Sequence, residues 1–195
     1  MIFKIKFFSL IFLLSLVAVS TNYYYGSLGV LPIDTFAHFD TGYRILNSEI
    51  PFVDYWTISG PFIDFLQAFY FSIFGVSWKI YMLNSSILNL ILTLISFLFF
   101  KKIGINYVYS FFYAFCVAIL ANPSMGTPFP DHYSTFFSFF AVISFTYALE
   151  TKNKFYWFII PILFFIAFFS KQTPAAYIIF ALIFNILIYL YFRKD

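Results

Sequence analysis

Residues 32–61, PIDTFAHFDTGYRILNSEIPFVDYWTISGP, form the longest stretch of this 195-residue chain that cannot lie in lipid. Four of the eight acidic residues of the protein fall within it, namely Asp34, Asp40, Glu49 and Asp54. The sequence on both sides is strongly apolar. Because charged groups are costly inside a bilayer, we expect a membrane-embedded frame that holds this polar segment at one membrane face.

The composition of the whole chain also indicates a membrane protein. Hydrophobic residues make up 63% of it and charged residues only 10%, with a mean hydropathy of +0.90. Soluble domains carry about 25% charged residues, and a surface with so few charges would be one large apolar patch. No basic patch for nucleic acid is present. The single cysteine, Cys116, excludes a disulfide within the chain and argues against a cysteine-based metal site.

The pattern of apolar runs predicts an all-α, multi-pass transmembrane bundle with about six spans in a single domain. A span needs about 20 apolar residues to cross a hydrocarbon core of about 30 Å. The expected spans lie near residues 7–25, 80–100, 105–122, 133–149, 155–169 and 175–192. We interpret the first as an uncleaved span, because the tyrosines at 23–25 are typical of an interfacial anchor.

The loop between the first two spans, residues 26–79, is expected to contain two interfacial helices, near 34–47 and 61–74. The second is apolar but too short to cross comfortably. At helical spacing, Phe69 and Ile73 share one of its faces, while Asp64 and Gln67 share the other. Such a two-faced pattern is typical of a helix that lies in the plane of the interface.

The distribution of basic residues predicts which loops are cytoplasmic. With the 61–75 segment on the surface, eight Lys and Arg residues lie inside and three outside. If that segment crossed the membrane, four would lie inside and seven outside. The positive-inside rule therefore favours a cytoplasmic N-terminus and an outer polar loop. The eight are Lys4, Lys6, Lys101, Lys102, Lys152, Lys154, Arg193 and Lys194; the three are Arg44, Lys79 and Lys171.

The expected helix near 34–47 carries the first candidate site. Asp34, His38 and Thr41 form one stripe at 100° per residue, opposite an aromatic stripe. A carboxylate in a partly desolvated pocket can act as a general base towards a hydroxyl. The alternative is that Asp34 only caps the helix, and Asp40 with Arg44 has the spacing of an ordinary surface pair.

Other polar residues lie on the expected outer side of the membrane. Asp54 is flanked by aromatic residues that suit either an anchoring loop or a substrate contact. Asp34, His38, Asp131 and His132 are candidate ligands for a divalent metal, but their spacing is not that of a tight site. Lys171 interrupts an apolar run, where it either snorkels to water or neutralises the phosphate of a lipid-linked substrate.

The order of several motifs resembles the N-terminal part of the polytopic GT-C glycosyltransferases. The motifs are an outer acidic residue after a proline, I-L-N-S-E-I-P-F-V-D-Y-W, G-P-F with a short helix ending in F-G, an outer Asp before the fourth span, and F-S-K-Q-T. More narrowly, the chain is similar to the dolichyl-phosphate-mannose protein mannosyltransferases, the aminoarabinose transferases and the RgtA/B/C/D-like group. Members usually run to several hundred residues, so the resemblance implies a truncated, split or short member.

The resemblance implies roles for particular residues. Asp34 takes the place of the first loop acid, which supplies the catalytic base, although Thr35 stands where many members have a second acid. Asp54 resembles the second loop acid, Asp131 the acid that opens a later helix, and Lys171 a family lysine. His38, Arg44, Asp54, Asp131 and Lys171 are therefore the candidates for binding substrate.

The function implied is transfer of a sugar from a polyprenyl-phosphate-linked donor to a hydroxyl of a lipid, glycan or protein. The reaction would take place at the outer face of the cytoplasmic membrane, with membrane lipid and the lipid-linked sugar as partners. A divalent metal is left open as a cofactor. The alternative is a non-catalytic membrane protein, either a remnant of a longer transferase or a transporter-like subunit. A transporter is expected to place acidic groups at the middle of the bilayer, which favours the transferase.

Overall fold

The computed structural model describes residues 2–29, 34–57, 59–122 and 126–192, without the side chains at positions 2–6, 34 and 189. Helices account for 82% of the chain, and the described residues contain no β-strand, which confirms the all-α prediction. Eight helices follow one another along these residues: α1 (Ile2–Ser27), α2 (Asp34–Leu46), α3 (Phe62–Phe74), α4 (Trp78–Lys102), α5 (Tyr107–Leu120), α6 (Pro130–Thr151), α7 (Lys154–Ser170) and α8 (Gln172–Phe192).

The ends of several helices are set by local sequence signals. The side chains of Ser77, Asn106 and Asn153 each precede a helix and accept a hydrogen bond from a backbone N–H in its first turn. This is the capping role that Ser and Asn fill best. Gly75 and Gly104 adopt positive φ values of 85° and 92° between helices, a conformation that glycine tolerates at little cost.

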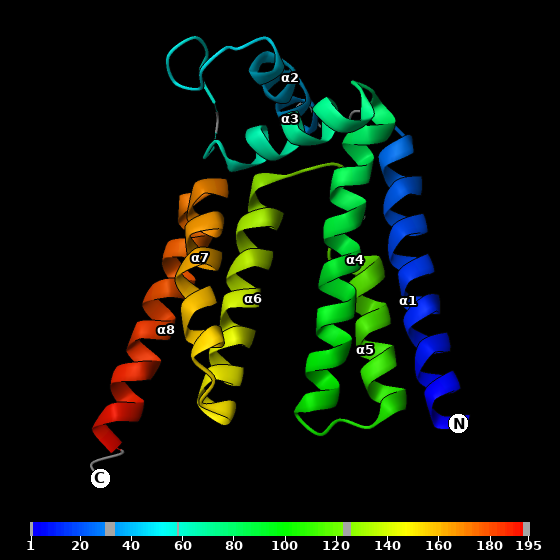
Figure 1. Cartoon of the computed structure of the whole chain (residues 1–195), viewed down its shortest axis with the longest axis vertical. Coiled ribbons are helices and arrows are strands. Elements are labelled where there is room, and N and C mark those ends of the chain that lie inside the picture. Colours follow the sequence, from blue (N-terminus) through cyan, green and yellow to red (C-terminus); the bar gives the residue numbers. More distant parts are fainter. Residues whose placement is uncertain (1, 30–33, 58, 123–125, 193–195) are drawn as a thin grey trace. The chain divides into compact units, whose positions relative to one another are not determined.

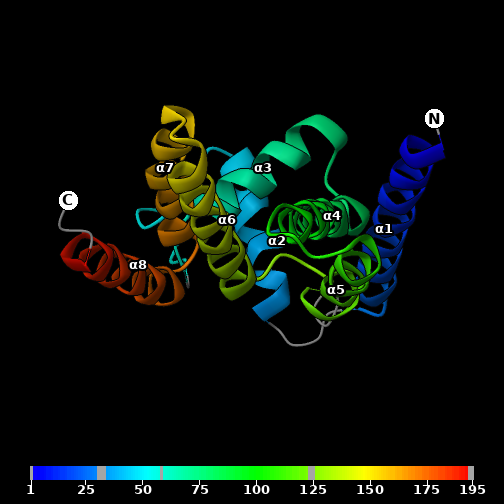
Figure 2. The same cartoon turned by 90° about the horizontal axis from the view of Figure 1, so that it is seen from below.

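The chain divides into two compact units: Met1–Trp56 with Asp64–Phe129, and Thr57–Ile63 with Pro130–Asp195. In the first unit, α4 packs against both α1 and α5 (Figures 1 and 2). Helices α2 and α3 lie across the end where α1 finishes and α4 begins (Figure 1). A hydrogen bond of 2.9 Å from Trp78 Nε1 to the carbonyl oxygen of Gly26 joins those two ends.

A row of buried polar side chains on α4 holds the first unit together. Asn89 Nδ2 donates to the carbonyl oxygens of Ala18 in α1, at 3.0 Å, and of Ala118 in α5, at 2.9 Å. Asn22 Nδ2 of α1 donates to the hydroxyls of Ser85 and Ser86, at 3.0 and 2.9 Å. Interhelical amide and hydroxyl contacts of this kind stabilise helix packing in lipid, where apolar contact gives little preference for protein over lipid tails.

The second unit consists of α6, α7 and α8 with the segment 57–63. Helix α7 packs against both α6 and α8. Gly60 lies against the backbone of Phe169 so closely that a Cβ atom there would overlap it. The N–H of Gly60 also donates to the carbonyl oxygen of Ser170 at 3.2 Å, so the end of α7 is tied to the segment that precedes α3.

Three of the helices are long and apolar enough to cross a bilayer: Phe7–Ser27, Trp78–Lys102 and Gln172–Phe192. They indicate a membrane protein. Helices α5 and α7, of 14 and 17 residues, are apolar but fall short of the length of about 20 residues that a crossing needs. Helix α6 has the length, 22 residues, but not the hydropathy. The six expected spans therefore all correspond to helices, and three of them meet the criteria for a span.

Candidate functional site

The polar faces of α2 and α3 meet at the carboxylate of Asp64. Thr41 Oγ1 donates to Asp64 Oδ1 at 2.6 Å, and His38 Nδ1 lies 2.7 Å from the same oxygen. Asp64 is fully buried, and His38 and Thr41 are 2% and 8% exposed. His38 and Thr41 share a face because they are three residues apart on a helix. Hydrogen bonds to a charged group are the stronger ones, so this cluster fixes α2 on α3.

Two of the three members of the stripe predicted for α2, His38 and Thr41, share a face, and the structure shows what that face contacts. His38 and Thr41 point into the protein, towards α3, whereas Phe36 and Tyr43 on the opposite side are 42% and 48% exposed. Helix α3 has the same arrangement. Its Asp64 and Gln67 are buried, and Phe69 and Ile73 are more than half exposed. The polar groups of the two short helices therefore meet inside the protein, and several of their aromatic and aliphatic side chains point outwards.

Further polar groups surround Asp64. Asn84 Nδ2 of α4 donates to Gln67 Oε1 at 2.8 Å. The hydroxyl of Tyr55 is buried, and burial, followed by the negative charge of Asp64, raises the pKa of Tyr55 above its usual value. Among the described residues, the side-chain atoms Asp64 Oδ2, Gln67 Nε2 and Tyr55 Oη have no hydrogen-bond partner.

Asp34 is the first residue of α2, one turn before His38. Its side chain lies outside the described part of the structure, so its proposed role as a base stays a prediction. The prediction for Asp40 and Arg44 is confirmed: Arg44 Nε donates to Asp40 Oδ2 at 2.7 Å in an exposed i,i+4 pair. Hydrogen bonds from Arg44 to Asp40 and then to Glu49 raise the pKa of Arg44, so the guanidinium stays charged.

Asp54 closes its own loop. Its Oδ2 accepts a 2.7 Å hydrogen bond from the backbone N–H of Ile50, and the N–H of Phe52 donates to the carbonyl oxygen of Tyr55 at 2.9 Å. These bonds hold Phe52 at a φ of 65°, which is unusual for a large side chain. Trp56 at the end of this loop is 81% exposed, as expected for an interfacial anchor.

Asp131 and Lys171, predicted separately, are brought together in the second unit. Lys171 Nζ lies 2.8 Å from Asp131 Oδ2, and both side chains are accessible, at 37% and 41%. The pair joins the first turn of α6 to the junction of α7 and α8. Ser134 Oγ donates to the backbone carbonyl of Lys171 at 2.7 Å and fixes the lysine's position. His132 stacks on Phe136 with a ring separation of 5.6 Å.

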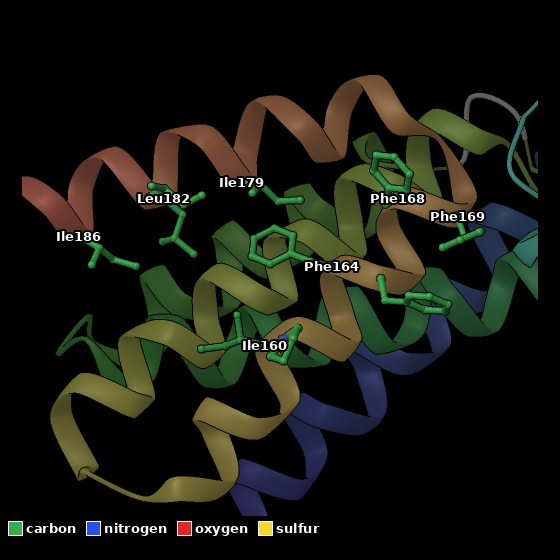
Figure 3. Close-up of a pocket in the computed structure, with 10 residues that line it drawn as sticks. Ile160, Phe164, Phe168, Phe169, Ile179, Leu182 and Ile186 are labelled. Carbon is green, nitrogen blue, oxygen red and sulfur yellow. The ribbon is translucent and has the colours of Figure 1, made fainter.

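An apolar groove runs between α7 and α8, with side chains from both helices along it (Figure 3). It measures about 480 Å³. One end lies at Phe168 and Phe169, shortly before Lys171 in the sequence, and the groove extends to Ile186 (Figure 3). The lining residues are Ile160, Pro161, Phe164, Phe165, Phe168, Phe169, Ile179, Leu182, Ile183 and Ile186.

The described side chains contain no group of three or more His, Cys, Asp and Glu residues that could hold a metal ion. Among the four candidate ligands, His38 pairs with Asp64, and Asp131 pairs with Lys171. Asp64 was not among the predicted site residues. The sequence does carry a signal for it. Asp64 and Gln67 are three residues apart, so they form a polar face on an otherwise apolar helix.

We compared the chain with protein-family models, with curated proteins and with solved structures, and nothing matches.

Proposed function

We propose that the chain is a membrane glycosyltransferase of the GT-C type, which moves a sugar from a polyprenyl-phosphate-linked donor to a hydroxyl of a lipid, glycan or protein. The reaction would take place at the outer face of the cytoplasmic membrane. The order of motifs along the sequence supports this proposal. So does the position of two short helices, α2 and α3, between the first two long apolar helices.

The observation that carries the proposal is the pairing of an accessible lysine with an apolar groove. Lys171 lies between α7 and α8 and follows Phe169, which lines the groove between these helices, by two residues. A lipid phosphate has one anionic group on a long apolar tail, which is the shape and charge that this arrangement suits. The phosphate would displace the carboxylate of Asp131 from Lys171, at little cost because exposed ion pairs are weak.

The proposed chemistry uses one base and one cation. Asp34 takes the proton of the acceptor hydroxyl as its oxygen attacks the anomeric carbon of the sugar. The bond from that carbon to the phosphate oxygen breaks, and the electron pair leaves with the polyprenyl phosphate. Lys171 stabilises the charge that develops on this leaving group. Each of these electrostatic contacts would be strengthened where lipid excludes water.

The test measures sugar transfer in membranes that contain the chain, with a radiolabelled polyprenyl-phosphate sugar as donor. We expect Asp34→Asn to lower the rate at least about 100-fold, the usual contribution of a general base. Lys171→Met should lower it by about 100-fold or more through loss of leaving-group stabilisation. Lys79→Met is the matched control, because Lys79 is an exposed lysine on the same predicted side of the membrane.

The outcomes separate the proposal from its alternative. Wild-type activity in the Asp34→Asn protein, at equal amounts in the membrane, would exclude Asp34 as the base. Equal losses in Lys171→Met and Lys79→Met would mean that Lys171 has no special role. No transfer by the unmodified chain with any polyprenyl-phosphate sugar would favour the non-catalytic membrane protein.

A further inference from the structure

The two carboxylate oxygens of Asp64 differ in their hydrogen bonds to the described residues. Oδ1 accepts a hydrogen bond from the hydroxyl of Thr41 at 2.6 Å and lies 2.7 Å from His38 Nδ1. Oδ2 has no hydrogen-bond partner among the described residues, although the side chain is fully buried. A carboxylate oxygen shut away from water without a donor is strongly unfavourable. Such an atom in a native protein calls for an explanation, and an ordered water or ion is one of the usual ones.

Gln67 presents the complementary group. It is three residues after Asp64 on α3, so the two side chains leave the same face of the helix. Asn84 Nδ2 donates a hydrogen bond to Gln67 Oε1 at 2.8 Å, and this bond fixes the orientation of the Gln67 amide. The remaining donor, Gln67 Nε2, is buried and has no partner in the described part of the chain.

Tyr55 supplies a third group of this kind. Its hydroxyl oxygen is buried and also lacks a partner among the described residues. The negative charge of Asp64 contributes to the raised pKa of Tyr55, so the hydroxyl lies within the field of that carboxylate. The guanidinium of Arg44 lies over the Tyr55 ring, 5.7 Å from its centre, and this cation–π contact helps to hold the ring.

We propose that Asp64 Oδ2, Gln67 Nε2 and Tyr55 Oη enclose one ordered water molecule. Such a water accepts a hydrogen bond from Gln67, donates one to Asp64 and shares one with Tyr55, which is the usual number of bonds for a buried water. A sodium ion fits this set less well, because hard cations take oxygen ligands and the amide of Gln67 presents N–H.

The water would make Asp64 the common point of three parts of the first unit. His38 and Thr41 bring α2 to this carboxylate, Gln67 lies beside it on α3, and Tyr55 belongs to the loop between the two helices. The inference does not depend on sugar transfer, and its tests measure structure and stability only.

The direct test is a cryo-electron microscopy map of the full chain in lipid nanodiscs, at a resolution that shows ordered water. Two samples would be compared, one in sodium chloride and one in choline chloride. We expect a peak within hydrogen-bond distance of Asp64, Gln67 and Tyr55 in both. A peak that disappears in choline would show a sodium ion and overturn the proposal. A direct contact between Gln67 Nε2 and Asp64 Oδ2, with no peak, would also overturn it.

A variant provides the second test. Tyr55→Phe removes one partner of the water and nothing else, so we expect the peak to weaken and Tm to fall by about 2–4 °C. Tyr43→Phe is the control, because Tyr43 is 48% exposed on α2, and its Tm should not change. A peak and a Tm that are both unchanged in Tyr55→Phe would overturn the three-partner site.

Discussion

Asp64 illustrates how one residue can organise a polar contact within an apolar protein. A charge buried inside a protein needs hydrogen bonds that replace those of water. Thr41 and His38 supply them from α2, 23 and 26 residues earlier in the chain. The exposed side of each helix carries aromatic residues, such as Phe36 of α2 and Phe69 of α3. The polar side chains of α2 and α3 therefore contact each other inside the protein. Asp64 therefore contributes to the packing of both helices.

Asp64→Asn tests this contribution at the scale of one residue. The change keeps the size of the side chain but removes its charge, so the bonds from Thr41 and His38 weaken. We expect the free energy of unfolding to fall by ~1–3 kcal/mol, measured as a fall in Tm in detergent or nanodiscs.

Asp40→Asn is the control for this experiment. Asp40 also binds a basic side chain, Arg44, but with 47% exposure of its own side chain. Surface ion pairs contribute about 0–1 kcal/mol, so a much smaller shift is expected. Shifts of the same size in the two variants would show that burial does not distinguish Asp64.

At the scale of secondary structure, α4 is the helix around which the first unit is built. Its apolar composition allows it to cross a membrane, yet one face carries a line of buried polar residues. These residues donate to, or accept from, α1 and the end of α5. The same helix supplies Asn84 to the Gln67 amide. Helix α4 thus connects the packing of the spans to the cluster between α2 and α3.

Asn89→Leu tests the polar face of α4. Asn89 Nδ2 binds the carbonyl oxygens of Ala18 and Ala118 at once, so leucine removes a contact with two neighbouring helices. Interhelical hydrogen bonds in membranes are worth about 0.6 kcal/mol on average and at most about 1.7. We expect a loss of stability of roughly that size for each bond, measured by thermal unfolding in nanodiscs.

Asn185→Leu on α8 is the matched control. Asn185 is exposed, and its Nδ2 donates within its own helix, to the carbonyl oxygen of Ala181 at 2.7 Å. Leucine there removes no contact with another helix, so no loss of stability is expected. If Asn185→Leu destabilised the protein as much as Asn89→Leu, the interhelical bonds would not be the cause.

At the scale of the whole molecule, the arrangement of charges predicts the orientation in the membrane. Helix α3 is short, and its polar face is buried against the protein. If α3 lies in the interface, the loops carrying Lys101, Lys102, Lys152 and Lys154 are cytoplasmic. This orientation follows the positive-inside rule, and it places the α2–α3 cluster on the outer side.

Cysteine labelling checks this orientation. In a Cys116→Ala background, cysteines at the exposed positions Ser48 and Lys152 would be labelled in intact cells with a reagent that does not cross membranes. We expect labelling at position 48 and none at position 152 until the membrane is opened. Labelling of both positions from outside would show that α3 crosses the membrane, since one additional crossing reverses every later loop.

The sequence by itself determined the class of fold and the positions of the helices. Composition, the lengths of the apolar runs and capping residues such as Asn106 act locally, so they can be read along the chain. The stripe of His38 and Thr41 follows from helical periodicity in the same way. The ion pair of Arg44 with Asp40 was also predictable, because both residues lie on one helix.

Only the tertiary structure decided which polar groups meet. Asp64 joins residues more than twenty positions away, and Asp131 joins Lys171 forty positions later. The sequence offered an interfacial helix, whereas packing turned the polar face of α3 into the protein and made Asp64 its centre. Helical periodicity specifies the faces of a helix but not its neighbours. The neighbours depend on how separate helices pack, which no local pattern encodes.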